Sequence, residues 1–331
     1  MDEREARQAV ADAGRILLKE GLVARTWGNM SCRIDEKTFA ITPSGLSYES
    51  MTADDVVVYN MEDETWCGSR KPSSEKGVHI AAYKQFRDAG FVVHTHQTYA
   101  SALGLSGFDT LSPTTEENDI LGGIALAKYG LPGTKHLCSN VTTALTKGAY
   151  AVLMAQHGAL IAGRDQKDAC DRARFLEEVC KRACKGQPGA GELHREQEIL
   201  RVVSRAREFY PYAGFTVAPP VREVAATVRS FRAQLDDMAQ MIGARLIVID
   251  AEPELILNAL KARSAVLVKG LGAICRADTN GDVAALKLLT EKACVCFLHT
   301  RALKADIALS PLDAMLMRMV YKNKYSKKIG G

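Results

Sequence analysis

Hydrophobic and polar residues follow two different periods along the first half of the chain. From residue 3 to 21 apolar residues recur every three or four positions, as on one face of a helix, and Gly21 ends the pattern. The same helical period covers two further segments, 75–86 and 168–184. Three shorter apolar stretches predict strands: 38–42, 91–96 and 151–156. Helices interleaved with strands in this way predict an α/β fold.

The second half of the chain begins at a break in this pattern. Residues 185–192 (KGQPGAGE) are rich in glycine and proline, and a polar helix is expected after them, at about 193–208. The segment 209–221, which contains YPYAGFTVAPP, has the composition of a linker. We therefore expect a first domain over 1–208, a linker over 209–221 and a smaller second domain over 222–331.

An internal repeat connects the two halves. Residues 151–180 and 265–294 align without a gap at an offset of 114, and eight of the thirty pairs are identical. Two similar strand–turn–helix units can resemble each other by chance, but here the strand, the glycine turn and the helix all keep register, which favours a duplication. His157 aligns with Leu271, so the second copy lacks whatever chemistry His157 supplies.

Composition narrows the class of protein. The 331 residues are 47% hydrophobic and 25% charged, with a net charge of +4, which excludes general disorder and gives no electrostatic reason for nucleic-acid binding. No apolar run has the ~18 residues of a membrane span, and the acidic N-terminus does not resemble a signal peptide. Nine cysteines without framework spacing favour reduced thiols, so we expect a cytoplasmic protein.

Three histidines at strand ends indicate a metal site. His94 and His96 flank one residue of a predicted strand, so both rings point to the same side and can reach one ion. His157 follows another apolar strand and is the natural third ligand of an open zinc site. The alternative is a set of hydrogen-bonded surface histidines. The remaining histidines, His79 among them, have no partner motif and are expected to be structural or exposed.

Three polar segments are candidates for binding an anion or for simple turns. Lys71–Glu75 lies at a predicted helix start, where hydroxyls and free N–H groups can hold an anion, although Glu75 could instead cap the helix. The segments 26–31 and 42–45, each taken alone, favour polar turns.

Taken together, five motifs identify a family resemblance. G-N-x-S, T-P-S-G, S-S-E, H-x-H and Q-H-G follow one another in this order between residues 28 and 158. In order and spacing they resemble the class II aldolase/adducin family, over about residues 5–184. The resemblance implies a three-layer αβα sandwich around a mainly antiparallel sheet, to which this chain adds a smaller C-terminal α/β half-repeat. It also implies a homo-oligomer with the site near a subunit boundary.

The resemblance also implies roles for individual residues. They are His94, His96 and His157 as zinc ligands, Glu75 as the acidic residue beside the metal, and Thr26, Gly28, Asn29, Ser44, Gly45, Ser73 and Ser74 as the pocket for a substrate phosphate. Mn²⁺ and Co²⁺ suit similar nitrogen and oxygen sites.

The activity implied is that of a zinc-dependent lyase. It would cleave or form a C–C bond in a phosphorylated ketose through an enediolate, with dihydroxyacetone phosphate as the ketone half. The alternatives are a pentulose-phosphate 4-epimerase, a decarboxylase of a 3-oxo acid phosphate and a non-enzymatic scaffold like the adducin head. Measured zinc content would distinguish the enzymes from the scaffold, because a protein without catalytic chemistry needs neither three metal ligands nor a carboxylate and a phosphate pocket. The expected partner is a small sugar phosphate, without nucleic acid or membrane.

Two features depart from the family pattern. Aldolases of the family use a tyrosine after the H-x-H motif as a proton donor, and residues 110–123 have no tyrosine. The carboxylate-rich part of this segment either replaces it or is a solvated loop, and Tyr210 and Tyr212 are candidates for a second family tyrosine. The second domain lacks the site motifs, so we expect a degenerate, non-catalytic half-domain that packs on the first domain or alters a subunit contact.

Overall fold

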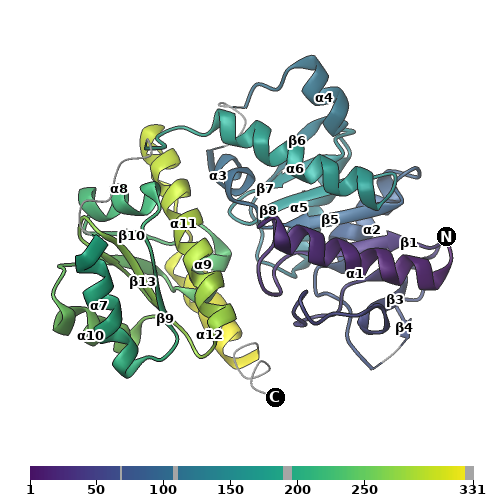
Figure 1. The fold of residues 1–331 in the computed structure, drawn as a ribbon. Helices are drawn as coiled ribbons and strands as arrows, with labels where there is room; N and C mark the ends of the chain where they lie inside the picture. The colour runs from purple at the N-terminus through teal and green to yellow at the C-terminus, as the bar shows by residue number, and fades with distance from the viewer. Residues whose placement is uncertain (68, 107–110, 189–195, 325–331) are drawn as a thin grey trace. The chain divides into compact units, whose positions relative to one another are not determined.

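The chain forms two compact units, Met1–Ala183 and Cys184–Gly331, in a computed structural model (Figure 1). The structure describes residues 1–67, 69–106, 111–188 and 196–324. Each unit has its own β-sheet covered by helices, which is the α/β architecture expected. Among the described residues, every helix is too short or too polar to cross a membrane.

The first unit is built on an eight-stranded sheet with the order β4-β3-β2-β1-β5-β8-β7-β6. Neighbouring strands are antiparallel except β6 and β7. Its strands are β1 (Asn29–Arg33), β2 (Thr38–Ile41), β3 (Val57–Asn60), β4 (Trp66–Cys67), β5 (Phe91–Thr95), β6 (Ile124–Ala127), β7 (Ala151–Met154) and β8 (Gly158–Gly163). Its helices are α1 (Glu3–Lys19), the short 3-10 helix η1 (Ala53–Asp55), α2 (Lys76–Gln85), α3 (Thr98–Ser106), α4 (Thr115–Leu121), α5 (Lys135–Leu145) and α6 (Gln166–Ala183).

Helices cover both faces of this sheet and make three layers. On one side α1 and α3 each pack on α6, and these helices cover β1, β5 and β8; on the other, α2 packs on α5 (Figure 1). Along β5, Val92 joins the core beneath α2 and α5, and the alternation of side chains places His94 on that same face. The predicted αβα sandwich around a mainly antiparallel sheet is confirmed.

The second unit contains a five-stranded sheet with the order β10-β11-β12-β13-β9. Its strands are β9 (Ala213–Thr216), β10 (Ser230–Arg232), β11 (Arg245–Ile249), β12 (Ala265–Val268) and β13 (Gly272–Arg276). Its helices are α7 (Glu196–Phe209), α8 (Pro219–Thr227), α9 (Asp236–Met241), α10 (Pro253–Ala262), α11 (Asn280–Ala302) and α12 (Pro311–Lys324).

The second unit begins earlier than the sequence analysis placed it. Helix α7, expected inside a domain over 1–208, buries Ile199 and Val203 in one core with Leu260 and Leu271 of the second unit. The segment 209–221, expected to be a linker, contains all of β9 and the start of α8. Its prolines flank a strand that is only four residues long and contains Gly214, which is why its composition resembled that of a linker.

A shortened chain tests this division. A chain that ends at residue 208 keeps α7 without the rest of its core, so we expect the backbone amides of 196–208 to exchange with deuterium as in an unstructured peptide. In the full chain the same amides are expected to be protected, and mass spectrometry measures both. A chain that ends at residue 187 lacks α7 altogether and is the matched control for the fold of the first unit. Equal protection of α7 in the full chain and in the 1–208 chain would contradict the division.

The repeat seen in the sequence has a counterpart in strand register. Ala151 pairs with Ile161 and Met154 with Gly158 in the β7–β8 hairpin. In β12–β13, Ala265 pairs with Cys275 and Val268 with Gly272, the same pairs displaced by 114. The neighbours correspond too, because β6 and β11 are parallel to β7 and β12, whereas β5 and β9 are antiparallel to β8 and β13. The second unit therefore has the topology of the β5-β8-β7-β6 half of the first sheet.

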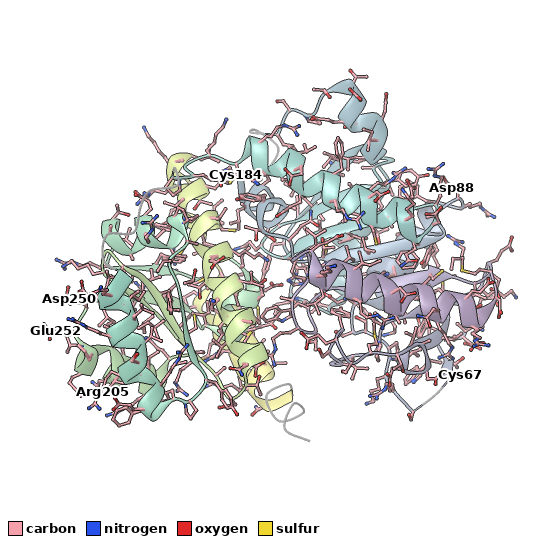
Figure 2. The ribbon with its side chains drawn as sticks, in the orientation of Figure 1. Cys67, Asp88, Cys184, Arg205, Asp250 and Glu252 are labelled. Carbon is pink, nitrogen blue, oxygen red and sulfur yellow. The ribbon has the colours of Figure 1, made fainter. Side chains whose placement is uncertain are left out.

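Polar contacts at the surface contribute little to holding either unit together. In the first unit the Tyr150 hydroxyl donates to Asp88 over 2.7 Å, and in the second Lys269 pairs with Asp250 over 3.0 Å (Figure 2). An exposed ion pair such as Lys269–Asp250 contributes about 0–1 kcal/mol. The buried apolar side chains between helices and sheets must therefore supply most of the stability of each unit.

Candidate active site

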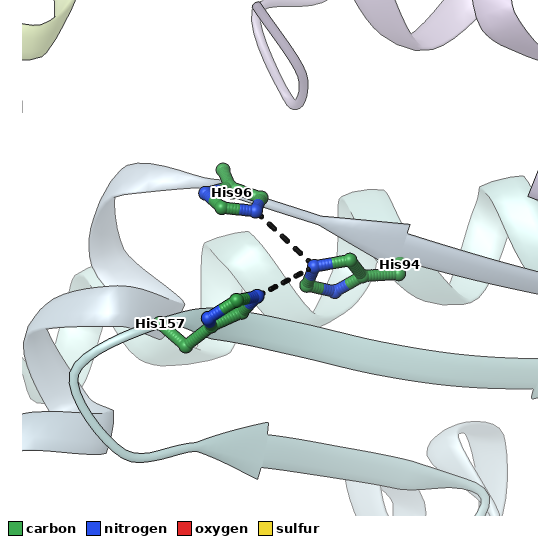
Figure 3. A group of neighbouring side chains, drawn as sticks. All are labelled: His94, His96 and His157. Atoms are coloured by element: carbon green, nitrogen blue, oxygen red, sulfur yellow. Dashed lines mark hydrogen bonds between the residues drawn. The ribbon is translucent and has the colours of Figure 1, made fainter. Parts of the chain in front are cut away.

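The three predicted metal ligands converge at the ends of neighbouring strands. His94 lies on β5 and His96 just beyond it, while His157 precedes β8, the antiparallel neighbour of β5 (Figure 3). His94 and His157 are buried and His96 is half-buried. The Nε2 atom of His94 is 3.1 Å from that of His96 and 2.9 Å from that of His157. The alternative of hydrogen-bonded surface histidines does not describe this arrangement, because His94 and His157 are buried.

The backbone at two turns brings the site together. Gln156 adopts a left-handed conformation, with φ 61°, in the turn that carries His157, and such strain often occurs at functional sites. Gly28 has φ +83°, and a Cβ there would lie 2.5 Å from the carbonyl oxygen of His94. Only glycine permits that approach, which sets Asn29 of β1 directly opposite His94 of β5.

The donor set fits a divalent metal ion. The Nδ1–H of His94 donates to the carbonyl oxygen of Ala159 over 2.9 Å, which leaves the Nε2 lone pair available to a metal. In a tetrahedral site with metal–nitrogen bonds of about 2.0–2.1 Å, ligand nitrogens lie about 3.3–3.4 Å apart. The Nε2 separations in the cluster are a few tenths of an ångström shorter, so a small displacement of the rings accommodates an ion.

Glu75 directs its carboxylate into the histidine cluster. Oε2 lies 3.3 Å from Nε2 of His94, and Oε1 lies 3.2 Å from Nε2 of His157. Burial by itself would raise the pKa of Glu75, but electrostatic interactions with His157 and His94 outweigh it and hold that pKa well below its usual range. Glu75 is the N-cap residue of α2, yet its side chain makes no capping hydrogen bond. The capping alternative is therefore wrong, and the carboxylate is ionised beside the candidate ligands.

Two loops of the predicted phosphate pocket are joined to each other. The N–H of Ser44 donates to the carbonyl of Lys71 over 2.9 Å, and the N–H of Ser73 donates to that of Thr42 over 3.1 Å. In the described residues no hydrogen bond engages the N–H of Gly45 or Ser74. The loops therefore present these N–H groups and the serine hydroxyls next to Glu75, which is what an anion requires.

The other predicted residues are placed less uniformly. Thr26 is half-buried in the loop before β1, and no hydrogen bond joins it to the pocket among the described residues. Part of the carboxylate-rich segment forms α4, where Glu117 completes a capping box and pairs with Arg182, while Glu116 and Asp119 are exposed. Residue 110 of that segment lies outside the described residues.

Tyr210 and Tyr212 lie in the second unit, with the guanidinium of Arg276 over the Tyr210 ring.

Sequence reasoning missed His79, which lies on α2 in the interior of the first unit. It is fully buried, and its Nε2 lies within hydrogen-bond distance of Oδ1 of Asn29. A signal was present, because Glu75, His79 and Tyr83 are spaced four residues apart and so share one face of the predicted helix. Of the two expectations for this histidine, structural or exposed, the structure shows a buried residue, and its neighbour Asn29 is one of the predicted site residues.

The second unit has apolar residues where the first has its histidines. Leu160, which pairs with His94, corresponds in the repeat to Ile274, which pairs with Phe215. Two residues further along the chain, Val217 stands in the position of His96. Leu271 stands in the position of His157 and is completely buried in the apolar core. The copy retains the strands but none of the three nitrogen ligands.

Known proteins resemble the first unit. The family model of the class II aldolase and adducin N-terminal domain matches residues 8–184, more than half of the chain. The L-ribulose-5-phosphate 4-epimerase UlaF of Salmonella paratyphi C is 34% identical over 192 residues, which cover 54% of this chain and 84% of the epimerase.

Solved structures show the same relationship. An L-fuculose 1-phosphate aldolase aligns with a TM-score of 0.50 and 28% identity, over 59% of this chain and 94% of the aldolase. YgbL from Klebsiella pneumoniae shares the fold, with a TM-score of 0.50 and 24% identity over 55% of this chain and 89% of YgbL. The matched residues, the fold and the ordered motifs agree, and the chain belongs to the class II aldolase and adducin N-terminal domain family.

Proposed function

We propose that the first unit is a metal-dependent aldolase that cleaves or forms a C–C bond in a phosphorylated ketose through an enediolate, with dihydroxyacetone phosphate as its ketone half. The observation that carries the proposal is the convergence of three histidine Nε2 atoms, of which those of His94 and His157 lie next to the buried carboxylate of Glu75. The family and the likeness to an L-fuculose 1-phosphate aldolase support it.

The metal ligands and Glu75 would have different chemical roles. His94, His96 and His157 would hold the metal ion, zinc in the first instance, with Mn²⁺ or Co²⁺ as substitutes. When bound, the ion supplies a Lewis acid that polarises substrate oxygens. Glu75 would accept a proton from substrate carbon or oxygen and return it, because it is ionised and lies next to the ligands.

The phosphate would be held away from the reacting carbons. Ser44, Ser73 and Ser74 offer hydroxyls, and Gly45 and Ser74 offer backbone N–H groups that no described backbone acceptor engages. Asn29 can add only one N–H of its side-chain amide, because the other is donated to Glu75. Binding of the phosphate away from the reacting carbons fixes the orientation of the substrate. This lowers the activation barrier, although the phosphate pocket takes no direct part in bond breaking.

A second candidate is a 4-epimerase of a pentulose phosphate. The observation that favours it is the 34% identity to proteins named L-ribulose-5-phosphate 4-epimerase. Such an enzyme would open the same C–C bond, rotate the aldehyde and close the bond again. Both candidates need the same ligands and the same carboxylate, so they differ in substrate rather than in the machinery of the site.

The remaining assignments concern the whole chain. We propose that the second unit is non-catalytic, because its counterparts of the ligands are Phe215, Val217 and Leu271. We also propose that the protein works on a small sugar phosphate in the cytoplasm, as a homo-oligomer. Size-exclusion chromatography with light scattering measures the oligomeric state.

Proton exchange tests the function. Metal-loaded protein is incubated with dihydroxyacetone phosphate in D₂O, and the carbinol protons are followed by NMR. Stereospecific exchange is the expected result, since formation of the enediolate removes one proton. In parallel, L-ribulose 5-phosphate is followed for inversion at carbon 4. Exchange without inversion supports the aldolase, inversion without exchange supports the epimerase, and neither from fully metal-loaded protein contradicts both.

A further inference from the structure

A chain of buried hydrogen bonds runs from the interior of the first unit to Glu75. The hydroxyls of Tyr83 and Ser31 are 2.8 Å apart, and the Ser31 hydroxyl is 2.7 Å from Nδ1 of His79. Nε2 of His79 meets Oδ1 of Asn29, and Nδ2 of Asn29 is 3.0 Å from Oε2 of Glu75. Tyr83, Ser31, His79 and Asn29 are all at most 3% exposed. We call Tyr83, Ser31, His79, Asn29 and Glu75 together the relay.

Every hydrogen in the relay has a determined direction. A carboxylate only accepts, so the Asn29 amide must turn its NH₂ towards Glu75 and its oxygen towards His79. The ring nitrogen that faces this oxygen must then be the N–H of His79. Burial and the nearby His94 lower the pKa of His79 to about 3, so the ring is neutral and its Nδ1 accepts from the Ser31 hydroxyl. Ser31 in turn accepts from Tyr83, and all the donors point towards the carboxylate.

The two oxygens of Glu75 therefore have different environments. Oε2 accepts the Asn29 amide, whereas Oε1 is buried, receives no bond from that amide and faces Nε2 of His157 at 3.2 Å. A bond to one oxygen fixes the plane of the carboxylate and leaves the lone pairs of the other for a proton. Bonds that point the same way along a chain also polarise one another and strengthen it.

We propose that His79 is a positioning residue, which locks the Asn29 amide so that Oε2 of Glu75 is held and Oε1 is the oxygen that takes the substrate proton. The proposal rests on the proposed function for the identity of that proton, but not for the direction of the hydrogen bonds. It also gives Asn29 a primary role that differs from phosphate binding.

One test of the relay needs no turnover. Uniformly ¹⁵N-labelled protein is studied by long-range ¹H–¹⁵N correlation of the histidine rings, with His79 assigned from the His79→Gln spectrum. The expected signature at neutral pH is a ring protonated at Nε2 only. A ring protonated at Nδ1, or at both nitrogens, would overturn the direction of the relay. This result stands whether or not the proposed substrates are accepted.

A kinetic test addresses the consequence for Glu75. His79→Phe keeps the ring volume but removes both nitrogens, and we expect kcat for proton exchange to fall about 10- to 100-fold, as when a group that orients a catalytic residue is lost. KM for dihydroxyacetone phosphate should change less than about twofold, and metal content should stay at that of the native chain. His79→Gln, whose amide can donate to Asn29 and accept from Ser31, should restore most of kcat.

The matched control is His299→Phe, which makes the same change at a fully buried histidine of the second unit. It should leave kcat unchanged. A raised KM with normal kcat in His79→Phe would overturn the proposal and assign Asn29 to the phosphate. The proposal also fails if His79→Gln is no better than His79→Phe, or if His79→Phe behaves like the control. If His79→Phe does not fold, the protonation state of the His79 ring and the kcat of His79→Gln still test the proposal.

Discussion

A variant that carries His94→Ala and His96→Ala is expected to lose both its metal ion and its activity. The native chain should bind one divalent ion per chain and not two, because the second unit has no counterpart of the ligands. With one imidazole left, the variant should retain less than a tenth of that ion. Lewis-acid stabilisation contributes several kcal/mol, and about 1.4 kcal/mol corresponds to a factor of ten, so exchange should fall at least about 10³-fold.

Metal analysis and NMR exchange on the same samples check both statements. His136→Ala is the control, because it removes an exposed imidazole of α5 whose one hydrogen bond among the described residues is to Asn140. It should keep the ion and the rate. A double variant with full metal content would show that the ion binds elsewhere, and two ions per native chain would show that the second unit has a site of its own.

Glu75→Gln is expected to reduce the exchange rate by about 10²- to 10⁴-fold while the metal ion is retained, since this is the range that a positioned acid or base contributes. The substitution preserves the shape of the side chain but removes the charge and the basic lone pairs of Oε1. Because the three histidines still supply the ligands, the loss should appear in kcat and not in metal content. Metal analysis and NMR exchange on the same samples distinguish a loss of kcat from a loss of metal.

Two further variants test whether the loss of activity is specific to Glu75. Glu20→Gln, at a surface carboxylate that pairs with Arg174, should leave the rate unchanged. Glu117→Gln addresses the alternative that the carboxylates of α4 supply the acid or base. A loss in Glu117→Gln as large as that in Glu75→Gln would contradict the assignment of proton transfer to Glu75 alone.

The ligand cluster was predictable because strand geometry is local and regular. An H-x-H motif places two rings on one side of any strand, and an apolar run before His157 indicates a strand that ends near it. The pairing of Asn29 with His94 was not predictable in the same way, since register between distant strands depends on the turn at Gly28.

Two features remained hidden for physical reasons. The relay depends on a buried polar residue, His79, whose significance comes from partners on β1 that are distant in sequence. The segment 209–221 was assigned as a linker because β9 has only four residues, too few for alternation to be detected against the prolines that follow. Tertiary pairing with β13, and not local propensity, makes it a strand.

The position of β9 affects how the second unit behaves towards other chains. In the first unit β1 pairs with β5, but β9, which corresponds to β5, is the last strand of its sheet. A terminal strand offers unpaired N–H and C=O groups to any extended peptide and so promotes aggregation. Here the edge strand is four residues long, and Pro219 and Pro220, which lack the N–H of a strand, follow it closely. Among the described residues β9 therefore has no counterpart of β1 beside it, and its edge is too short for another chain to extend.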